Sequence, residues 1–140
     1  VGFPNESDEN HNDTISLMKE IVYSFGFMYK YSERPGTLAE RKLEDNVEEK
    51  VKKQRLQEIV DLQQIHSLKR TKEFLNKKVE VLIERQSKKS DKQWAGKTEH
   101  NKVVVFPKEN YKIGDFVNVI TTNCTSATLI GKAIEFSKNN

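Results

Sequence analysis

A group of basic side chains in the second half of the chain has the composition of a phosphate-binding surface. Between positions 77 and 112 there are 10 basic and 5 acidic residues. The basic candidates for contact with a nucleic acid are Arg85, Lys88, Lys89, Lys92, Lys97 and Lys102. Lysine and arginine neutralise backbone phosphates, so a basic patch of this kind is typical of nucleic-acid binding. A solvated surface with scattered lysines has the same pattern, and the pattern alone favours that alternative.

Two aromatic residues, Trp94 and Phe106, lie among these basic residues. Aromatic rings stack on the bases of single-stranded nucleic acid, so both are candidates for RNA contact. In a small domain such rings more often fill the core. We therefore expect Trp94 to be mostly buried and Phe106 to serve both roles.

The residue types that support other chemistries are sparse. Cys124 is the single cysteine, which excludes an internal disulfide, a multi-cysteine zinc site and a cysteine-held iron–sulfur cluster within this chain. His11, His66 and His100 are far apart, with no carboxylate or cysteine at a metal-ligand spacing. The sequence therefore predicts no metal site and no catalytic residue here.

Charge is distributed unevenly along the 140 residues. Residues 1–45 carry a net charge of −4, whereas residues 75–140 carry +5. An asymmetry of this kind between halves indicates a polyanionic partner for the basic half.

Residues 1–45 have the pattern of a helix followed by a strand. Ser7 or Asp8 is a suitable helix cap, and apolar residues then follow at spacings of three and four as far as Phe25. Gly26 is a plausible helix stop. Aromatic residues alternate with others over 25–31, which predicts a strand, and a turn follows at 34–37. A single helix and strand cannot cover both faces of a sheet, so we expect a slice of a larger α/β sheet or barrel.

A long helix is predicted over residues 46–76. Asn46 and Glu49 form a capping signature at its start. Its apolar stripe comprises Val47, Val51, Ile59, Leu62, Ile65 and Leu68. We interpret it as a connecting helix, because its heptad repeat is too short and irregular for a dimeric coiled coil.

Residues 77–136 change to a period of two. Short strands are predicted at 79–84, 94–98, 102–106, 115–122 and 127–136, separated by polar turns. Five short strands in one domain favour a small closed antiparallel barrel, since closure removes exposed strand edges.

Apolar runs are only a few residues long, which predicts no membrane-spanning segment. No signal peptide is visible either, so we expect a cytoplasmic protein. The chain begins with Val1 in a strand-like stretch, and we expect it to be a piece of a longer protein.

Several strings resemble those of the radical-SAM methylthiotransferases. VGFPNES at 1–7 is similar to their Gly-Phe-Pro-Gly-Glu-Thr, and FMYKYSERPGT at 27–37 is similar to Phe-x-Tyr-Ser-x-Arg-Pro-Gly-Thr. The basic half resembles their closing TRAM domain, a small OB-like barrel, in the strings SKKS at 87–90, GKT at 96–98 and NKVVVFP at 101–107, with IG, VIT and LIG further on. These TRAM strings most resemble the branch that acts on isopentenylated adenosine in tRNA.

The resemblance implies a three-part enzyme with a cluster-binding domain, a radical-SAM TIM-like barrel and TRAM. Residues 1–74, with the connecting helix 46–76, would hold the last part of that barrel, and residues 75–138 would be TRAM. The implied reaction adds a methylthio group to carbon 2 of isopentenyladenosine at position 37, beside the anticodon of tRNA. The implied cofactors are two 4Fe-4S clusters and S-adenosylmethionine, none of them held by Cys124. The implied partners are the tRNA anticodon stem-loop and the absent cluster-binding and barrel segments, so this fragment alone is expected to be inactive.

The resemblance also marks site residues. Arg85, Lys88, Lys89, Lys97, Asn101, Lys102 and Phe106 become candidate RNA contacts. Gly2, Phe3, Pro4, Glu6 and Arg34 become a possible rim of the active site. Asn5 stands where the family has glycine, and asparagine tolerates the positive φ that glycine would adopt.

Three alternatives remain open. A sister enzyme methylthiolates threonylcarbamoylated adenosine in tRNA, and another modifies a ribosomal protein. Arg34-Pro35 argues against the ribosomal branch, and only the TRAM strings argue against the other. A stand-alone RNA-binding module without an attached enzyme belongs to a different class.

Overall fold

The computed structural model describes residues 1–137. The last residue of the predicted TRAM domain, Lys138, lies outside them. The chain divides into two compact units between His66 and Ser67, rather than at the predicted boundary after residue 74. The end of the long helix therefore belongs with the second unit.

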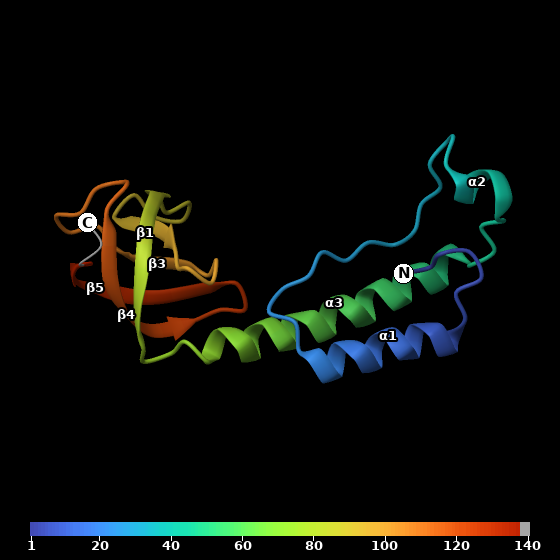
Figure 1. Ribbon diagram of the computed structural model, residues 1–140, viewed down its shortest axis with the longest axis horizontal. Helices are drawn as coiled ribbons and strands as arrows, with labels where there is room; N and C mark the ends of the chain where they lie inside the picture. Colours follow the sequence, from blue (N-terminus) through green and yellow to red (C-terminus); the bar gives the residue numbers. More distant parts are fainter. Residues whose placement is uncertain (138–140) are drawn as a thin grey trace. The chain divides into compact units, whose positions relative to one another are not determined.

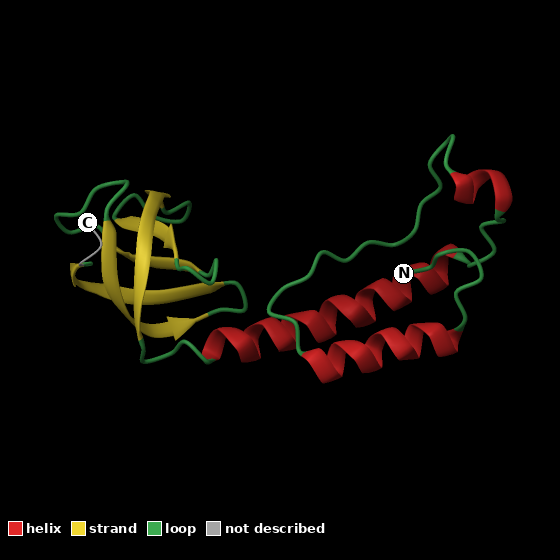
Figure 2. Cartoon of the chain, in the orientation of Figure 1, coloured by secondary structure: helices red, strands yellow, loops and turns green. Residues whose placement is uncertain are grey.

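The first unit is helical (Figures 1 and 2). It contains α1 (Asp8–Ile21), α2 (Leu38–Lys42) and most of α3 (Glu49–Lys72). Ser7 caps α1 as predicted, and its side chain and that of Asn10 form a reciprocal capping box. The predicted helix stop at Gly26 is wrong. The helix ends at Ile21, because Val22 adopts a left-handed conformation and its N–H donates to the carbonyl of Met18.

The strand predicted over residues 25–31 is absent, and within the described residues before Lys78 there is no strand. A trace of strand pairing does exist. The amino group of Val1 donates to the carbonyl of Tyr29 at 2.8 Å, and the N–H of Tyr31 donates to the carbonyl of Val1 at 2.7 Å. This alternation is the hydrogen-bonding pattern of two parallel strands. The expected sheet is therefore reduced to these two hydrogen bonds. The side chains that it would cover are exposed, Phe27 to 81% and Tyr29 to 73%.

The helix α3 is shorter at both ends than the predicted range 46–76. Asn46 does not cap it, because its side chain binds the backbone N–H and side chain of Asn5 instead. Of the predicted apolar stripe only Ile59 is buried, and Ile65 is 64% exposed. The buried face has helical spacing but is mostly polar; it comprises Lys52, Arg55, Ile59, Gln63 and His66.

Arg55 is the central polar residue of this face. Its side chain is 7% exposed and donates to Glu6 Oε1 at 2.9 Å, to the Glu6 carbonyl at 2.9 Å and to Asp8 Oδ1 at 2.7 Å. These contacts raise the pKa of Arg55, first through the hydrogen bond with Asp8 and then through Glu6. His11 Nε2 also lies 2.7 Å from Glu58 Oε2, so α1 and α3 are joined side by side by polar contacts.

The second unit is a closed five-stranded barrel. Its strands are β1 (Lys78–Gln86), β2 (Gln93–Lys97), β3 (Val103–Pro107), β4 (Phe116–Cys124) and β5 (Thr128–Phe136). All five predicted strands are confirmed within two residues of their predicted ends. The order around the barrel is β1-β2-β3-β5-β4. The barrel is not wholly antiparallel, because β3 and β5 pair in parallel, with Val104 opposite Leu129.

Inward side chains of β1, β3, β4 and β5 fill the barrel, and the partly buried Trp94 of β2 packs against them. The buried cluster comprises Val81, Ile83, Val104, Phe106, Val117, Val119, Leu129 and Ala133. Phe106 is the largest fully buried side chain, at 0% exposure. Closure requires close approach between strands at Gly96, where an added Cβ would overlap with the Leu82 carbonyl oxygen and the Val81 side chain.

Replacing Gly96 with alanine should destabilise the barrel by about 1–3 kcal/mol or more, as overpacking does, because the backbone of β1 would have to shift. Urea unfolding followed by Trp94 fluorescence measures the change. Gly131→Ala should behave alike, since its Cβ would meet the Ile120 carbonyl. An unchanged midpoint for both variants would show that the strands are less closely packed than described.

The Arg55 contacts predict an unequal effect of removing its two acidic partners. Glu6→Ala should destabilise the helical unit by about 3 kcal/mol, because Glu6 is 17% exposed and its loss leaves a buried guanidinium short of a partner. The matched control Asp8→Ala should cost about 1 kcal/mol or less, because Asp8 is 92% exposed. Far-ultraviolet circular dichroism during urea unfolding reports on these helices. Equal effects of the two substitutions would contradict the assignment of Glu6 as the main anchor.

Candidate nucleic-acid interface

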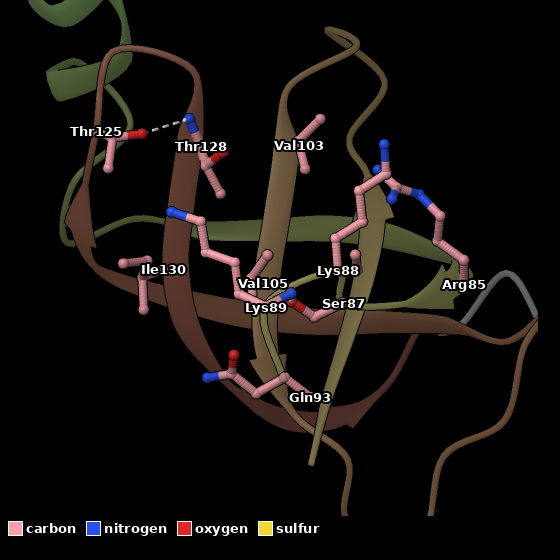
Figure 3. A pocket seen from close by; sticks show the side chains of 11 residues that line it. Arg85, Ser87, Lys88, Lys89, Gln93, Val103, Val105, Thr125, Thr128 and Ile130 are labelled. Carbon is pink, nitrogen blue, oxygen red and sulfur yellow. Dashed lines mark hydrogen bonds between the residues drawn. The ribbon is translucent and has the colours of Figure 1, made fainter. Parts of the chain in front are cut away.

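A cleft of about 270 Å³ lies on the outside of the barrel, over β2, β3 and β5 (Figure 3). Its lining comprises Arg85, Ser87, Lys88, Lys89, Gln93, Ala95, Val103, Val105, Thr125, Thr128 and Ile130. The floor is apolar, and the rim carries three basic and several polar side chains. Of the predicted RNA contacts, this cleft brings together Arg85, Lys88 and Lys89.

A β-bulge explains how Arg85 reaches this face. Ile83 pairs with Gly96 and Arg85 pairs with Ala95, so Glu84 is an extra residue in β1. Strict alternation from the buried Ile83 would point Arg85 inward, but the bulge turns it to the outer face that Ala95 shares. Lys88 and Lys89 follow in the turn between β1 and β2.

The three basic side chains of the cleft are exposed and without an acidic partner within the described part of the chain. Figure 3 shows Lys89 extended toward Thr128 and Ile130, while Arg85 and Lys88 lie at the opposite side of the cleft. Unpaired cations at both sides of an apolar floor can bind an anion without first breaking an ion pair. This arrangement suits a phosphate-bearing ligand.

Lys97 and Asn101 are not part of the cleft. They line a different hollow, together with the three carboxylates of Glu80, Glu84 and Glu99. Asn101 adopts a positive φ of 59° in the turn before β3. Neighbouring carboxylates repel phosphates, so the structure separates these two residues from the basic group with which the sequence placed them.

Lys102 has a structural contact of its own. Its amine donates to Thr71 Oγ1 at 3.3 Å, and burial lowers its pKa. Thr71 is fully buried and in turn donates to the carbonyls of Ser67 and Ser126. Lys102 therefore joins the segment before β3 to the end of α3, and Thr71 joins that end to the β4–β5 turn.

Of the two aromatic residues, Phe106 differs from its predicted role and Trp94 does not. Phe106 is 0% exposed in the core, so no face of its ring is available for stacking. Trp94 is mostly buried, as predicted, and it packs against the core cluster. Its Nε1 donates to the Tyr111 carbonyl at 3.1 Å, and the Lys108 amine lies 4.3 Å from the centre of the indole ring.

Sequence reasoning missed the floor of the cleft and its polar side chains Gln93, Thr125 and Thr128. One signal was present. Residues 103–106 are Val-Val-Val-Phe, a continuous apolar run in a barrel strand, where the exterior positions are normally polar. Val104 and Phe106 face the core, so Val103 and Val105 must lie outside.

The predicted active-site rim is divided between buried and exposed residues. Gly2 and Pro4 are buried, and the second carboxylate oxygen of Glu6 accepts from the Gly2 N–H at 2.9 Å. Glu6 thus holds its own loop as well as Arg55. Phe3 and Arg34 are exposed and line a hollow of about 370 Å³, together with Tyr29, Tyr31 and neighbouring residues. Asn5 has the predicted positive φ, 66°.

The residues present do not fit an iron–sulfur cluster, because Cys124 is the single cysteine and a cluster needs several thiolates. Among residues 1–137 no group of three or more histidine, cysteine or acidic side chains could hold a metal ion. In the same residues no helix has both the length and the apolar character needed to cross a membrane.

Comparison with known proteins places these features in a family. Residues 72–134 match the TRAM domain family. Over all 140 residues the chain is 61% identical to the tRNA-2-methylthio-N(6)-dimethylallyladenosine synthase of Christiangramia forsetii, and 59% identical to that of Flavobacterium johnsoniae. Over 133 residues it is 50% identical to the synthase of Bacteroides thetaiotaomicron.

The chain spans 29% of the length of each of these relatives. The similarity includes both units, since it covers all of this chain in the first two relatives. Residues 72–134 are therefore a TRAM domain, and the whole chain is homologous to a segment of the tRNA-2-methylthio-N(6)-dimethylallyladenosine synthases.

Proposed function

We propose that this chain is the C-terminal part of a radical-SAM tRNA methylthiotransferase, and that its TRAM domain binds the tRNA. The similarity to tRNA-2-methylthio-N(6)-dimethylallyladenosine synthases covers all 140 residues, at 61% and 59% identity. Their name specifies dimethylallyladenosine, which supports this nucleoside over threonylcarbamoyladenosine or a ribosomal protein. The proposed target is carbon 2 of that adenosine at position 37, and the proposed binding partner is the anticodon stem-loop.

The main support for the RNA-binding role is the group of unpaired cations on the TRAM domain. Arg85, Lys88 and Lys89 lie on one cleft and have no acidic partner among the described residues. Phosphate contacts dominate the affinity of most nucleic-acid complexes, because binding releases condensed counterions. These side chains therefore supply affinity and position the RNA, without reading its sequence.

The chemistry itself is assigned to the remainder of the enzyme. The two 4Fe-4S clusters and S-adenosylmethionine belong in this proposal to segments outside the chain, since one cysteine cannot ligate a cluster. The proposed contribution of this chain is to hold tRNA in position while that chemistry proceeds in the cytoplasm.

A chimera tests the proposed activity. The synthase of Christiangramia forsetii, carrying this chain in place of its own equivalent segment, should restore 2-methylthio modification in bacteria that lack the enzyme. Mass spectrometry of tRNA nucleosides measures the product. The same synthase lacking the segment is the control and should yield none. A chimera that accumulates normally but yields no product would contradict the proposal.

Replacing both Lys88 and Lys89 with alanine should weaken binding of an anticodon stem-loop RNA to the 140-residue chain. The slope of log affinity against log salt should flatten by roughly 0.7 to 0.9 for each phosphate that is no longer neutralised. Fluorescence anisotropy over a series of salt concentrations measures both quantities. The weakening should be similar for RNAs of different sequence, because phosphate contacts carry little base information.

The matched control is Lys50→Ala with Lys53→Ala, which removes the same charge from the exposed side of α3. This pair should have a much smaller effect, and Lys53 lies 3.7 Å from Glu49 and is already partly compensated. A larger effect of the helix pair, or an unchanged slope for both pairs, would show that the cleft is not the RNA site.

A further inference from the structure

The cleft has a floor that phosphate binding does not require. Val105 and Ile130 lie side by side in the parallel pairing of β3 and β5, and Ala95 pairs with Val105 from β2. With Val103 they form an aliphatic surface on the outside of the barrel. A site that held only phosphates would gain nothing from such a surface, because apolar contact does not compensate an anion for its lost hydration.

The cleft, of about 270 Å³, has room for a group of the size of a nucleobase. Figure 3 shows Lys89 extended across the floor toward Thr128 and Ile130, with Arg85 and Lys88 at the other side. A group on the floor would therefore have cations within reach on both sides, as the phosphates that flank a nucleotide require.

Polar side chains at the edge can bind the edge of a base. Gln93 lines the cleft, and among the described residues no hydrogen bond engages its side-chain amide. Thr125 Oγ1 accepts from the N–H groups of Ala127 and Thr128 at 3.3 and 3.1 Å, which leaves its hydroxyl hydrogen free to donate. An amide and a hydroxyl supply both donors and acceptors, and base edges present both.

We propose that this cleft binds one unstacked nucleotide of RNA. The base lies on the floor of Ala95, Val103, Val105 and Ile130, its edge meets Gln93 and Thr125, and its phosphates contact Lys88 and Lys89. The inference rests on the proposed RNA-binding function and adds to it that the ligand is an unpaired loop or bulge nucleotide. A continuous duplex cannot present a base in this way, because its bases are stacked and paired.

Methyl NMR of the 140-residue chain tests the proposal directly. One sample receives a stem-loop RNA with unpaired loop nucleotides, and the other receives a blunt duplex of equal length and charge. A base on the floor should shift the methyl signals of Val103, Val105 and Ile130 upfield through its ring current. These shifts should appear with the stem-loop and be absent with the duplex, while the backbone signals of Lys88 and Lys89 move with both.

A polar substitution in the floor separates the base contact from the phosphate contact. Val105→Thr keeps shape and charge but makes the floor polar, so it should weaken stem-loop binding roughly 10-fold, the loss expected for one apolar group in a pocket. Its affinity for the duplex and its salt slope should not change. Ile134→Thr is the control, because it makes another apolar position polar on β5 outside the cleft, where Ile134 is 50% exposed. Both variants are first compared with the parent chain in urea unfolding.

The possible outcomes distinguish this inference from the proposed function. If Lys88 and Lys89 respond to both RNAs but the methyl groups do not, the cleft binds phosphates only and the inference is overturned, while RNA binding stands. Equal methyl shifts with the duplex would also overturn it. If neither RNA shifts any signal, RNA binding by this domain fails as well. The wild-type spectra decide between these outcomes even if Val105→Thr does not fold.

Discussion

The closure of the barrel through the parallel pairing of β3 and β5 is the constraint on which the candidate site depends. Without that pairing, the outer faces of β2, β3 and β5 would not form one continuous surface. Closure also demands that backbones approach closely, which Gly96 and Gly131 permit because neither has a Cβ. The bulge at Glu84 then turns Arg85 onto the same surface. The cleft is thus a product of strand geometry more than of any single side chain.

The helical unit follows a different rule, since its central contacts are polar. The buried face of α3 carries Lys52 and Arg55, and acidic residues before and within α1 and before α3 neutralise them. A buried guanidinium requires partners at fixed positions, so it determines the position of the loop around Glu6 more specifically than an apolar contact would. The exposed aromatic residues at 25–29 contribute little to this unit, and a larger sheet would be needed to cover them.

The barrel could be predicted from the sequence, because its strands alternate regularly and end at turn residues. The parallel pairing could not, since alternation indicates which face a residue takes but not which strand lies beside it.

Phe106 was misjudged for a related reason: its register in β3, and not its residue type, places it in the core. The bulge that turns Arg85 outward leaves no signature that a single sequence shows. In the sequence, Lys97 and Lys102 looked equivalent to Lys88. In the structure, Lys97 has acidic neighbours and Lys102 has a buried partner, Thr71. In the first unit, the buried face of α3 could not be predicted from its apolar stripe. That rule assumes that the buried face of a helix is apolar, whereas this face is mostly polar.

The unpaired cations of the cleft also have a thermodynamic consequence for the barrel itself. Like charges held close together repel, so Arg85, Lys88 and Lys89 lower the stability of the empty domain relative to one with neutral residues there. Any polyanion that binds only the folded state recovers this energy by mass action, in proportion to the logarithm of its free concentration. Stability and ligand occupancy are therefore linked. The free domain is less stable because of the same cations that allow it to bind an anion.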